Sequence, residues 1–255
     1  MPDPYLPGCA PFSFDGGQVG VLLLHGFTGS PQGLRPWGEA LRDAGFTVHC
    51  PCLPGHGTTW QDLATMRHPA WLDAGAQALE RLAARCDRVA VGSLSFGGSL
   101  ALHLAATRPD VVRSLITVNP WLFSKDPRLW LLPVLKHLLP SSPGVGSDIA
   151  DPEQREVAYE RVPLKALASA RRLQALVRRE IGRVTQPLLC YVSRQDHVAP
   201  PANTTWIAEH VASTDVEVVW LERSYHVATL DLERQAIFDG SVAFVRRTTT
   251  AAAQA

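Results

Sequence analysis

One short segment limits the folds open to this chain more than any other. Residues 89–94 form an apolar run typical of a buried strand, Ser95 follows, and Gly97 and Gly98 precede a helical stretch at 99–107. A serine held between a strand and a helix, with glycine two positions later, marks a sharp turn in which only small neighbours fit. The turn leaves the hydroxyl exposed above the sheet edge. We therefore predict that Ser95 is a nucleophile.

Ser93 is the alternative nucleophile in this segment. It stands where such a turn commonly has its first glycine, and serine is small enough for the turn to survive. If Ser93 were the nucleophile, glycine would be required two residues later, where Ser95 stands. The register therefore favours Ser95. The remaining alternative is a turn without chemistry, because short motifs recur by chance.

Two later loops carry the residues that would activate this serine. The apolar run 187–192 is predicted to be a buried strand that opens into a loop with Asp196, and the strand 216–221 leads to a loop with His226. Imidazole titrates near neutral pH, so His226 can take the serine proton and return it to the leaving group. Asp196 would fix the tautomer of the imidazole and stabilise its protonated form. Asp231 is expected to be the N-cap of the last helix.

The loop after an early strand is predicted to complete the reaction centre. The strand 19–24 ends in the glycine-containing turn 25–29, before a helix at 34–44. The backbone N–H groups of Phe27 and of Phe96 would face the oxygen that becomes negative during attack on a carbonyl. Their side chains either pack in the core or line an acyl pocket. His25 is expected to hold this loop in place.

The chain resembles the bacterial monoacylglycerol lipases and related small carboxylesterases of the α/β-hydrolase superfamily. The resemblance extends from about residue 20 to about residue 245. It rests on the turn at Ser95 and on residues 21–29 (VLLLHGFTG), 54–58 (PGHGT), 195–200 (QDHVAP), 224–231 (SYHVATLD), 146–148 (GSD) and 156–160 (EVAYE). It implies an α/β-hydrolase fold, with a mainly parallel central sheet flanked by helices and an inserted cap, and ester hydrolysis through an acyl-serine intermediate.

Composition bounds the remaining choices. A chain of 255 residues that is 46% hydrophobic can bury one sizeable core, and its 24 basic and 24 acidic residues give no electrostatic reason to expect nucleic acid as a partner. The N-terminus lacks a basic region followed by an apolar stretch, and no segment is long enough to span a membrane, so we expect a cytoplasmic protein. The five cysteines have no zinc-site spacing and are expected to be buried free thiols. Neither a metal nor a cofactor is predicted.

An insertion separates the strands 114–118 and 187–192. About seventy residues lie between them, far more than a crossover requires, which predicts a cap at 120–183 between core segments 1–119 and 184–255. Its first half is strongly apolar. These side chains either pack the cap on the core or form a lid over an acyl channel that touches lipid surfaces transiently. The second half, 143–183, is charged and helical in pattern, with a turn at 146–148.

Three residues near this insertion are candidates for substrate binding. The resemblance makes Glu156 the carboxylate that accepts hydrogen bonds from glycerol hydroxyls, with Val145 nearby. The residues alone leave another interpretation open, since Glu156 and Glu160 fall one helical turn apart and would then form a solvated helix face. Asn119, at the end of a strand, either lines the pocket or caps a turn.

The predicted function is hydrolysis of carboxylic esters, foremost of monoacylglycerols to fatty acid and glycerol. A general carboxylesterase acting on short simple esters is the nearest alternative, and an acyltransferase would use the same intermediate. A catalytically silent binding protein is a further alternative, because fold does not entail activity. The presence of Ser95, Asp196 and His226 argues against it. The partner is a small-molecule ester, and the sequence leaves the oligomeric state open.

Overall fold

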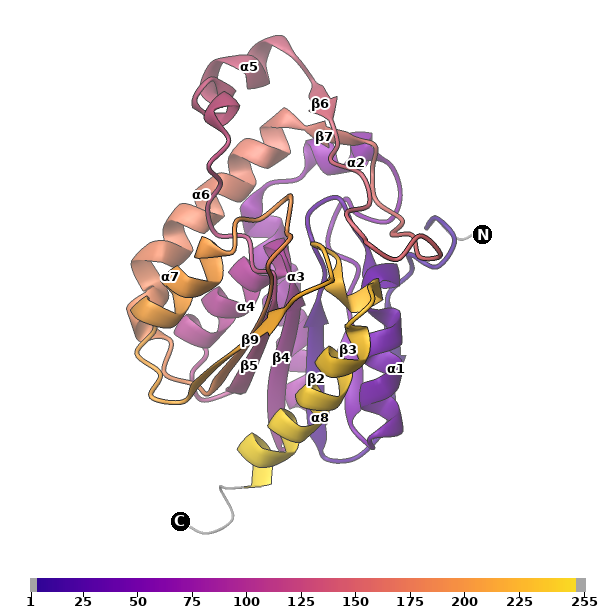
Figure 1. The fold of residues 1–255 in the computed structure, drawn as a ribbon, viewed down its shortest axis with the longest axis vertical. Coiled ribbons are helices and arrows are strands. Elements are labelled where there is room, and N and C mark those ends of the chain that lie inside the picture. The colour runs from indigo at the N-terminus through magenta and orange to yellow at the C-terminus, as the bar shows by residue number, and fades with distance from the viewer. Residues whose placement is uncertain (1–3, 251–255) are drawn as a thin grey trace.

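Seven strands form the central sheet in the order β1-β3-β2-β4-β5-β8-β9 (Figure 1). The computed structural model describes residues 4–250. Only β1 runs antiparallel to its neighbour, so the prediction of a mainly parallel sheet is confirmed. The strands are β1 (Phe12–Phe14), β2 (Val19–Leu24), β3 (Thr47–Cys50), β4 (Arg88–Leu94), β5 (Val112–Val118), β8 (Leu188–Ser193) and β9 (Val216–Leu221).

Helices cover both faces of the sheet. One face packs against α1 (Arg35–Asp43) and α8 (Arg234–Thr250), and the other against α3 (His68–Ala83), α4 (Phe96–Thr107) and α7 (Ala202–His210). Helix α6 (Leu164–Glu180) packs on α3 and α4. Along β2, Val21 and Leu23 belong to the first layer while Leu22 and Leu24 belong to the second. Because both faces are buried, the inner strands are almost continuously apolar, as is typical of parallel sheets.

Short elements complete the body of the molecule. The helix α2 (Trp60–Thr65) precedes α3, and 3-10 turns occur at η1 (Pro31–Leu34), η3 (Ile181–Arg183) and η4 (Ala228–Leu230). All five cysteines are free, and all except Cys52 are buried. Burial raises the pKa of Cys190 to about 12, so this thiol stays protonated at neutral pH. In the described part of the chain, no helix is both long and apolar enough to cross a membrane.

The insertion between β5 and β8 lies above the carboxyl ends of the strands (Figure 1). It contains η2 (Pro127–Trp130), α5 (Leu132–Leu138), the antiparallel pair β6 (Ser141–Pro143) and β7 (Arg161–Pro163), and then α6. Its first part packs through a small apolar cluster centred on Leu132, Leu164 and Leu167. In contrast, α6 contributes to the same large apolar layer as α4.

The helical pattern predicted within 143–183, apart from the turn at 146–148, is wrong for the first part of this segment. Residues 144–160, which we call the cap loop, contain no helix, and α6 begins only at Leu164. Two glycines and a proline lie in the cap loop and oppose helix formation. Hydrogen bonds to the body of the protein hold it instead, from the Tyr159 N–H to the Thr28 carbonyl and from the Val157 N–H to the Gln32 side chain.

Candidate active site

Ser95 occupies the tight turn between β4 and α4. Its backbone has φ 55° and ψ −118°, a left-handed conformation that residues other than glycine rarely adopt. The start of α4 lies so close to β2 that a Cβ added at Gly97 would come within 2.0 Å of the Leu24 carbonyl oxygen. Glycine at position 97 therefore allows this approach, which fixes where the Ser95 side chain emerges.

Ser93 has a different environment. It is fully buried in β4, and its hydroxyl donates a hydrogen bond to the Ile116 carbonyl on β5 at 3.1 Å. This bond satisfies the hydroxyl within the sheet, so serine fits where the turn commonly has glycine.

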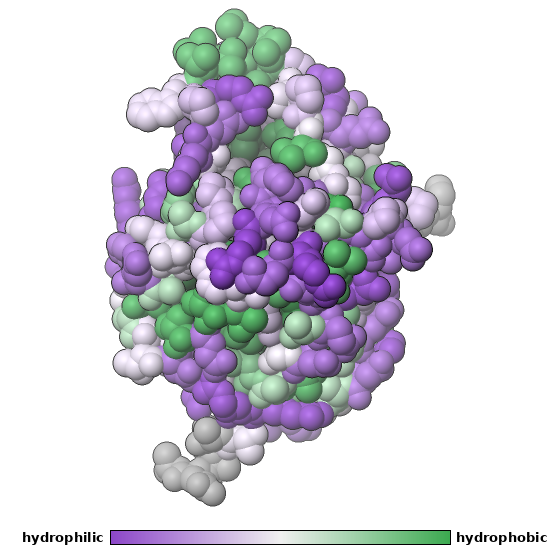
Figure 2. Space-filling view, viewed as in Figure 1, coloured by the Kyte–Doolittle hydropathy of each residue, from purple (hydrophilic) through white to green (hydrophobic). Residues whose placement is uncertain are grey.

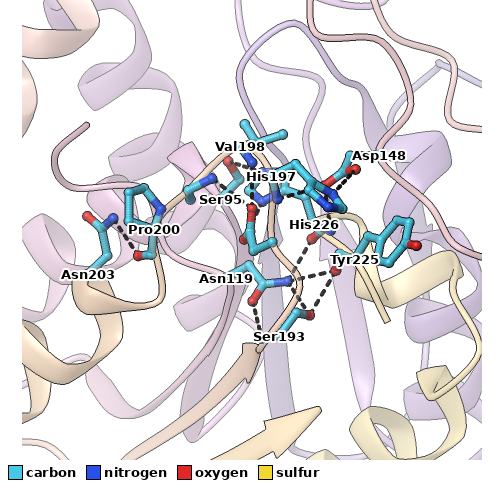
Figure 3. A network of polar contacts seen from close by, with 12 residues as sticks. Ser95, Asn119, Asp148, Ser193, His197, Val198, Pro200, Asn203, Tyr225 and His226 are labelled. Atoms are coloured by element: carbon cyan, nitrogen blue, oxygen red, sulfur yellow. Dashed lines mark hydrogen bonds and ion pairs between the residues drawn. The ribbon is translucent and has the colours of Figure 1, made fainter. Parts of the chain in front are cut away.

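Ser95, His226 and Asp196 form a chain of hydrogen bonds, of which Figure 3 labels Ser95 and His226. His226 Nε2 lies 2.8 Å from Ser95 Oγ, and Nδ1 lies 2.8 Å from Asp196 Oδ2. The loops after β8 and β9 carry Asp196 and His226, as the sequence pattern predicts. The second carboxylate oxygen of Asp196 accepts the N–H groups of Val198 and Ala199 at 2.8 and 2.7 Å, which fixes the carboxylate. This geometry lets a proton move from the serine to the imidazole.

The charges around His226 favour its protonated form. Burial alone lowers the pKa of the imidazole, but the carboxylates of Asp196, Glu156 and Asp148 outweigh burial, and the net pKa is raised. A base with a raised pKa holds the serine proton more firmly, and the same carboxylates stabilise the imidazolium that forms during attack.

The loop after β2 passes directly beside Ser95. A Cβ added at Gly26 would lie 3.4 Å from the Ser95 Cβ. His25 holds this loop, because its Nδ1 donates to the Gly26 carbonyl at 2.9 Å and its Nε2 accepts the Leu53 N–H at 3.0 Å. Burial lowers the pKa of His25 to about 4, so the ring is neutral and keeps this tautomer.

The backbone N–H groups of Phe27 and Phe96 lie on the two segments that flank Ser95. Within residues 4–250, neither group donates a hydrogen bond, so both remain able to bind an oxyanion. The Phe96 side chain is fully buried against Trp71, with ring centroids 5.3 Å apart. Phe27 is only partly buried and contacts Trp121 at the start of the insertion, with centroids 6.2 Å apart.

Glu156 reaches this site from the cap loop. Its Oε1 would lie 2.6 Å from a Cβ added at Gly29 and 3.5 Å from one at Gly33, so these glycines leave the room that the carboxylate occupies. No residue in the described range 4–250 gives this carboxylate a hydrogen bond. Burial raises its pKa to about 7, and His226 opposes the shift. Because the cap loop is not helical, Glu156 and the exposed Glu160 do not form the solvated helix face considered above.

Asn119 and Val145 have contrasting surroundings. Asn119 is 2% exposed, and its amide nitrogen donates to Ser193 Oγ and to the carbonyls of Tyr225 and His226, at 2.9, 3.1 and 2.8 Å. Its amide oxygen accepts the Ser193 N–H at 2.7 Å. The prediction that Asn119 lines the pocket is therefore corrected, since these bonds to the protein use its polar atoms. Val145 lies on the cap loop and is 67% exposed.

Two acidic residues have structural tasks that the sequence did not reveal. Asp231 is not the N-cap of α8, which begins at Arg234. Its carboxylate instead accepts the N–H groups of Ala150, Asp151 and Tyr225, and so ties the cap loop to the loop of His226. Asp148 makes a second such connection. No local pattern could have indicated the bonds of Asp231 to Ala150 and Asp151, or that of Asp148 to His226, because they join residues 78 to 81 positions apart.

No group of three or more His, Cys, Asp or Glu side chains in the described ranges could hold a metal ion. What the site contains is a serine, a histidine and a carboxylate in one hydrogen-bonded series, beside two unused backbone N–H groups. This arrangement can form and hydrolyse an acyl-serine.

Comparison with known proteins agrees with this chemistry. Residues 18–233 match the protein family described as serine aminopeptidase, S33. The chain belongs to this family of α/β-hydrolases. The chain is also 38% identical to a thermostable monoacylglycerol lipase from Bacillus sp. (strain H-257), over 94% of this chain and 96% of that protein. A carboxylesterase from Bacillus subtilis (strain 168) is 28% identical over 93% of this chain and 96% of its own length.

Solved structures agree with the family. A structure described for LipS and LipT, two metagenome-derived lipolytic enzymes, superposes with a TM-score of 0.93 and 38% identity, and covers 95% of this chain and 99% of that one. The chain is thus a serine ester hydrolase, and an acyl-serine intermediate is general to its family.

Proposed function

We propose that this serine hydrolase cleaves monoacylglycerols, with Ser95 as nucleophile, His226 as general base and acid, and Asp196 as the residue that orients the imidazole. The hydrogen bonds of 2.8 Å on both sides of the His226 ring support these roles. The name of the relative from Bacillus sp. (strain H-257) supports the substrate class.

The reaction follows from the positions of these groups. Ser95 Oγ attacks the ester carbonyl while His226 Nε2 takes its proton, and the N–H groups of Phe27 and Phe96 stabilise the negative oxygen. His226 then gives the proton to the departing glycerol oxygen, which leaves an acyl-serine. Water, deprotonated by His226, hydrolyses this intermediate and releases the fatty acid.

The single observation that carries the substrate proposal is the Glu156 carboxylate. The residue is partly buried and lies near His226, and its carboxylate lacks a hydrogen-bond donor among residues 4–250. Even partial burial without a donor is unfavourable for a carboxylate, and a ligand with adjacent hydroxyls would relieve that cost. The glycerol moiety of a monoacylglycerol has two free hydroxyls, whereas a simple alkyl ester has none. Val145, exposed on the same loop, would contact the substrate at the opening.

A substrate panel tests this proposal. Monoacylglycerols of several chain lengths are compared with diacylglycerols, triacylglycerols and short simple esters, by kcat/KM under matched detergent conditions. The proposal requires the highest kcat/KM for a monoacylglycerol. A preference for short simple esters would favour the general carboxylesterase. Transfer of the acyl group to an added alcohol, in preference to water, would favour an acyltransferase.

An aminoacyl arylamide belongs in the same panel, because the family description names aminopeptidases. An α-ammonium group would need an ionised carboxylate beside the nucleophile. The pKa of Glu156, about 7, leaves that carboxyl only partly ionised at neutral pH. We expect no measurable cleavage of the arylamide.

The cap, residues 120–183, supplies a contact with lipid surfaces in this proposal. Five apolar residues form what we call the apolar tip, seen over α5 in Figure 2: Trp130, Leu131, Val134, Leu138 and Leu139. Trp130 is 87% exposed. Lys136, Arg171 and Arg172 line a groove beside it. An exposed apolar group next to basic side chains is typical of surfaces that touch anionic lipid transiently.

Vesicle sedimentation tests this contact. Replacing both Trp130 and Leu138 with serine should lower the fraction of protein bound to anionic phospholipid vesicles several-fold. Each substitution removes apolar area that would be buried in the lipid interface. Hydrolysis of a soluble short ester should stay within about twofold, because Trp130 and Leu138 are exposed and lie outside the apolar cluster that contacts Phe27. Equal sedimentation of the variant and the wild type would exclude the apolar tip as the contact.

We further propose a cytoplasmic location. The five free cysteines support it, because free thiols persist in reducing compartments. Cell fractionation tests this, and enzyme recovered outside the cytoplasm would contradict it.

A further inference from the structure

Asp148 joins the cap loop to both loops that carry the histidine and the acid (Figure 3). Its Oδ2 accepts the backbone N–H of His226 at 3.1 Å and that of His197 at 3.2 Å. Its Oδ1 lies 2.8 Å from Nδ1 of the His197 ring. The Asp148 carbonyl also accepts the Val227 N–H at 3.0 Å. The Asp148 side chain is 12% exposed.

These contacts affect the alignment of the catalytic triad, Ser95, His226 and Asp196. His197 directly follows Asp196, and His226 is the base, so one carboxylate fixes the separation between the two loops. The 2.8 Å bond between Asp196 and His226 depends on that separation. The His197 ring also packs edge-on against Tyr225, with centroids 4.7 Å apart, which adds a second contact between the same loops.

Ser147, directly before Asp148 in the cap loop, binds Glu156. Ser147 Oγ accepts the Glu156 N–H at 3.1 Å. Ser147 thus holds the backbone of Glu156, the proposed ligand of the glycerol head group, and Asp148 holds the backbone of His226, the base. A displacement of Ser147 and Asp148 would therefore move both Glu156 and His226.

We propose that Asp148 is a positioning residue that couples the cap loop to catalysis, by aligning His226 with Asp196 and Ser95 only while the cap loop is seated on the two loops. The inference rests on the triad roles proposed above. Asp148 does not touch the reacting atoms, and it acts through His226 and His197.

Asp148 has an electrostatic effect in addition to its hydrogen bonds. The charged groups facing His226 are Asp196, Glu156 and Asp148, and the titratable ring facing Asp148 is His197. Burial lowers the pKa of His226, and the three carboxylates raise it. Removing the charge of Asp148 should therefore lower the pKa of His226 and move the acid limb of the kcat/KM profile to lower pH, because that limb reports the base in the free enzyme.

Two variants separate these effects. In Asp148→Ala both N–H groups lose their acceptor, so we expect kcat on a soluble simple ester to fall about 10- to 100-fold with KM within about threefold. Asp148→Asn keeps an oxygen that can accept both N–H groups but removes the charge. We expect its kcat to stay within about fivefold of wild type, with the acid limb shifted to lower pH by a few tenths of a unit.

Glu153→Gln is the matched control. It removes one negative charge from the same loop, and the exposed Glu153 carboxylate makes no hydrogen bond or ion pair with the described residues. Both kcat and the acid limb should match the wild type. All variants are assayed on the simple ester because it has no glycerol head group, so changes in head-group binding do not affect the measured kcat. The rate at which a fluorophosphonate labels Ser95 gives a second measure of serine reactivity, and it should fall with kcat in Asp148→Ala.

Three outcomes decide the matter. Wild-type kcat and labelling in Asp148→Ala would overturn the inference, while an inactive Ser95→Ala in the same experiment would leave the proposed triad standing. Equal loss in both Asp148 variants with an unmoved acid limb and lowered melting temperatures would also overturn it, because that pattern is merely structural. If Asp148→Ala does not fold, the kcat/KM profile of Asp148→Asn decides alone. An acid limb shifted to lower pH supports the inference, and an unmoved acid limb overturns it.

Discussion

At the scale of single residues, Glu156 is the most informative side chain outside the triad. Its carboxyl group is partly buried beside Gly29 and Gly33, has a pKa of about 7 and lacks a donor among residues 4–250. A group retained in this state, next to a reacting centre, is a strong candidate for substrate contact. The ordinary use of a buried carboxylate as a structural acceptor is seen instead at Asp148 and Asp231.

The Glu156→Ala variant should lose kcat/KM for monoacylglycerols about 10- to 100-fold, the usual range for a lost hydrogen bond to a charged group. Hydrolysis of a simple ester should change little, since that substrate has no free hydroxyls. The measured quantity is the ratio of the two kcat/KM values in each enzyme, which cancels general damage to the triad. Equal losses on both substrates would mean that Glu156 holds the cap loop, and no loss would remove it from the site.

The same ratio should depend on pH. The pKa of Glu156 is raised to about 7, so the carboxyl ionises as pH rises through 7. The ionised form is the stronger acceptor, and the preference for monoacylglycerols should therefore increase across this range. In Glu156→Gln the ratio should stay flat with pH. A wild-type ratio that does not change between pH 6 and 8 would contradict this account.

At the scale of elements, one side chain of α7 makes several of the hydrogen bonds that hold the start of the insertion. The Asn203 amide oxygen accepts the N–H groups of Leu122 and Phe123 at 2.8 and 2.7 Å, and its nitrogen donates to the carbonyls of Phe123 and Pro200. Asn203 is buried. Removing it would leave several buried backbone groups without partners.

Asn203→Ala should therefore lower the free energy of unfolding by about 2–4 kcal/mol, as judged from the cost of unsatisfied buried groups. Chemical denaturation measures this directly. Asn203→Asp is the comparison: it keeps the acceptor but sets a charged oxygen against the Phe123 and Pro200 carbonyls, so it should also be less stable than the wild type. If Asn203→Ala were as stable as the wild type, the first part of the insertion would be held by other contacts.

The sequence predicts those elements whose signals are local. Apolar runs mark the strands, and the triad residues stand just after strand ends, so their meeting follows from the parallel sheet. The cap loop was missed because glycines, a proline and contacts with residues 28 and 32 override a helical charge pattern. The true role of Asn119 was not predictable either, since its partners lie 74 to 107 positions away. The division of the chain at 120 and 183 stays a prediction.

At the scale of the whole molecule, two buried histidines make stability depend on pH. Burial lowers the pKa of His56 to about 3, with a smaller effect of His25, whose pKa is lowered to about 4. In the unfolded chain both rings take up protons near pH 6.5. Each therefore favours unfolding as pH falls from about 6.5 toward its folded pKa.

The His56→Gln variant tests this whole-molecule effect. Between pH 6.5 and 5, the slope of the free energy of unfolding against pH should be smaller in the variant, by up to about 1.4 kcal/mol per pH unit for one proton. Comparing slopes, rather than stabilities, removes the cost of the hydrogen bonds that the ring makes with the Leu53 and Pro54 carbonyls. Identical slopes in the two proteins would show that His56 does not stay neutral in the folded state.

The central claim is that Ser95 is the nucleophile, and covalent labelling tests it most directly. Wild type, Ser95→Ala and Ser93→Ala are treated with a fluorophosphonate, and the adduct is located by peptide mass. We expect one adduct, on Ser95, in the wild type and in Ser93→Ala, and none in Ser95→Ala, whose hydrolysis should fall by about 10⁴ to 10⁶ in kcat. An adduct on another residue, or an active Ser95→Ala enzyme, would contradict the claim.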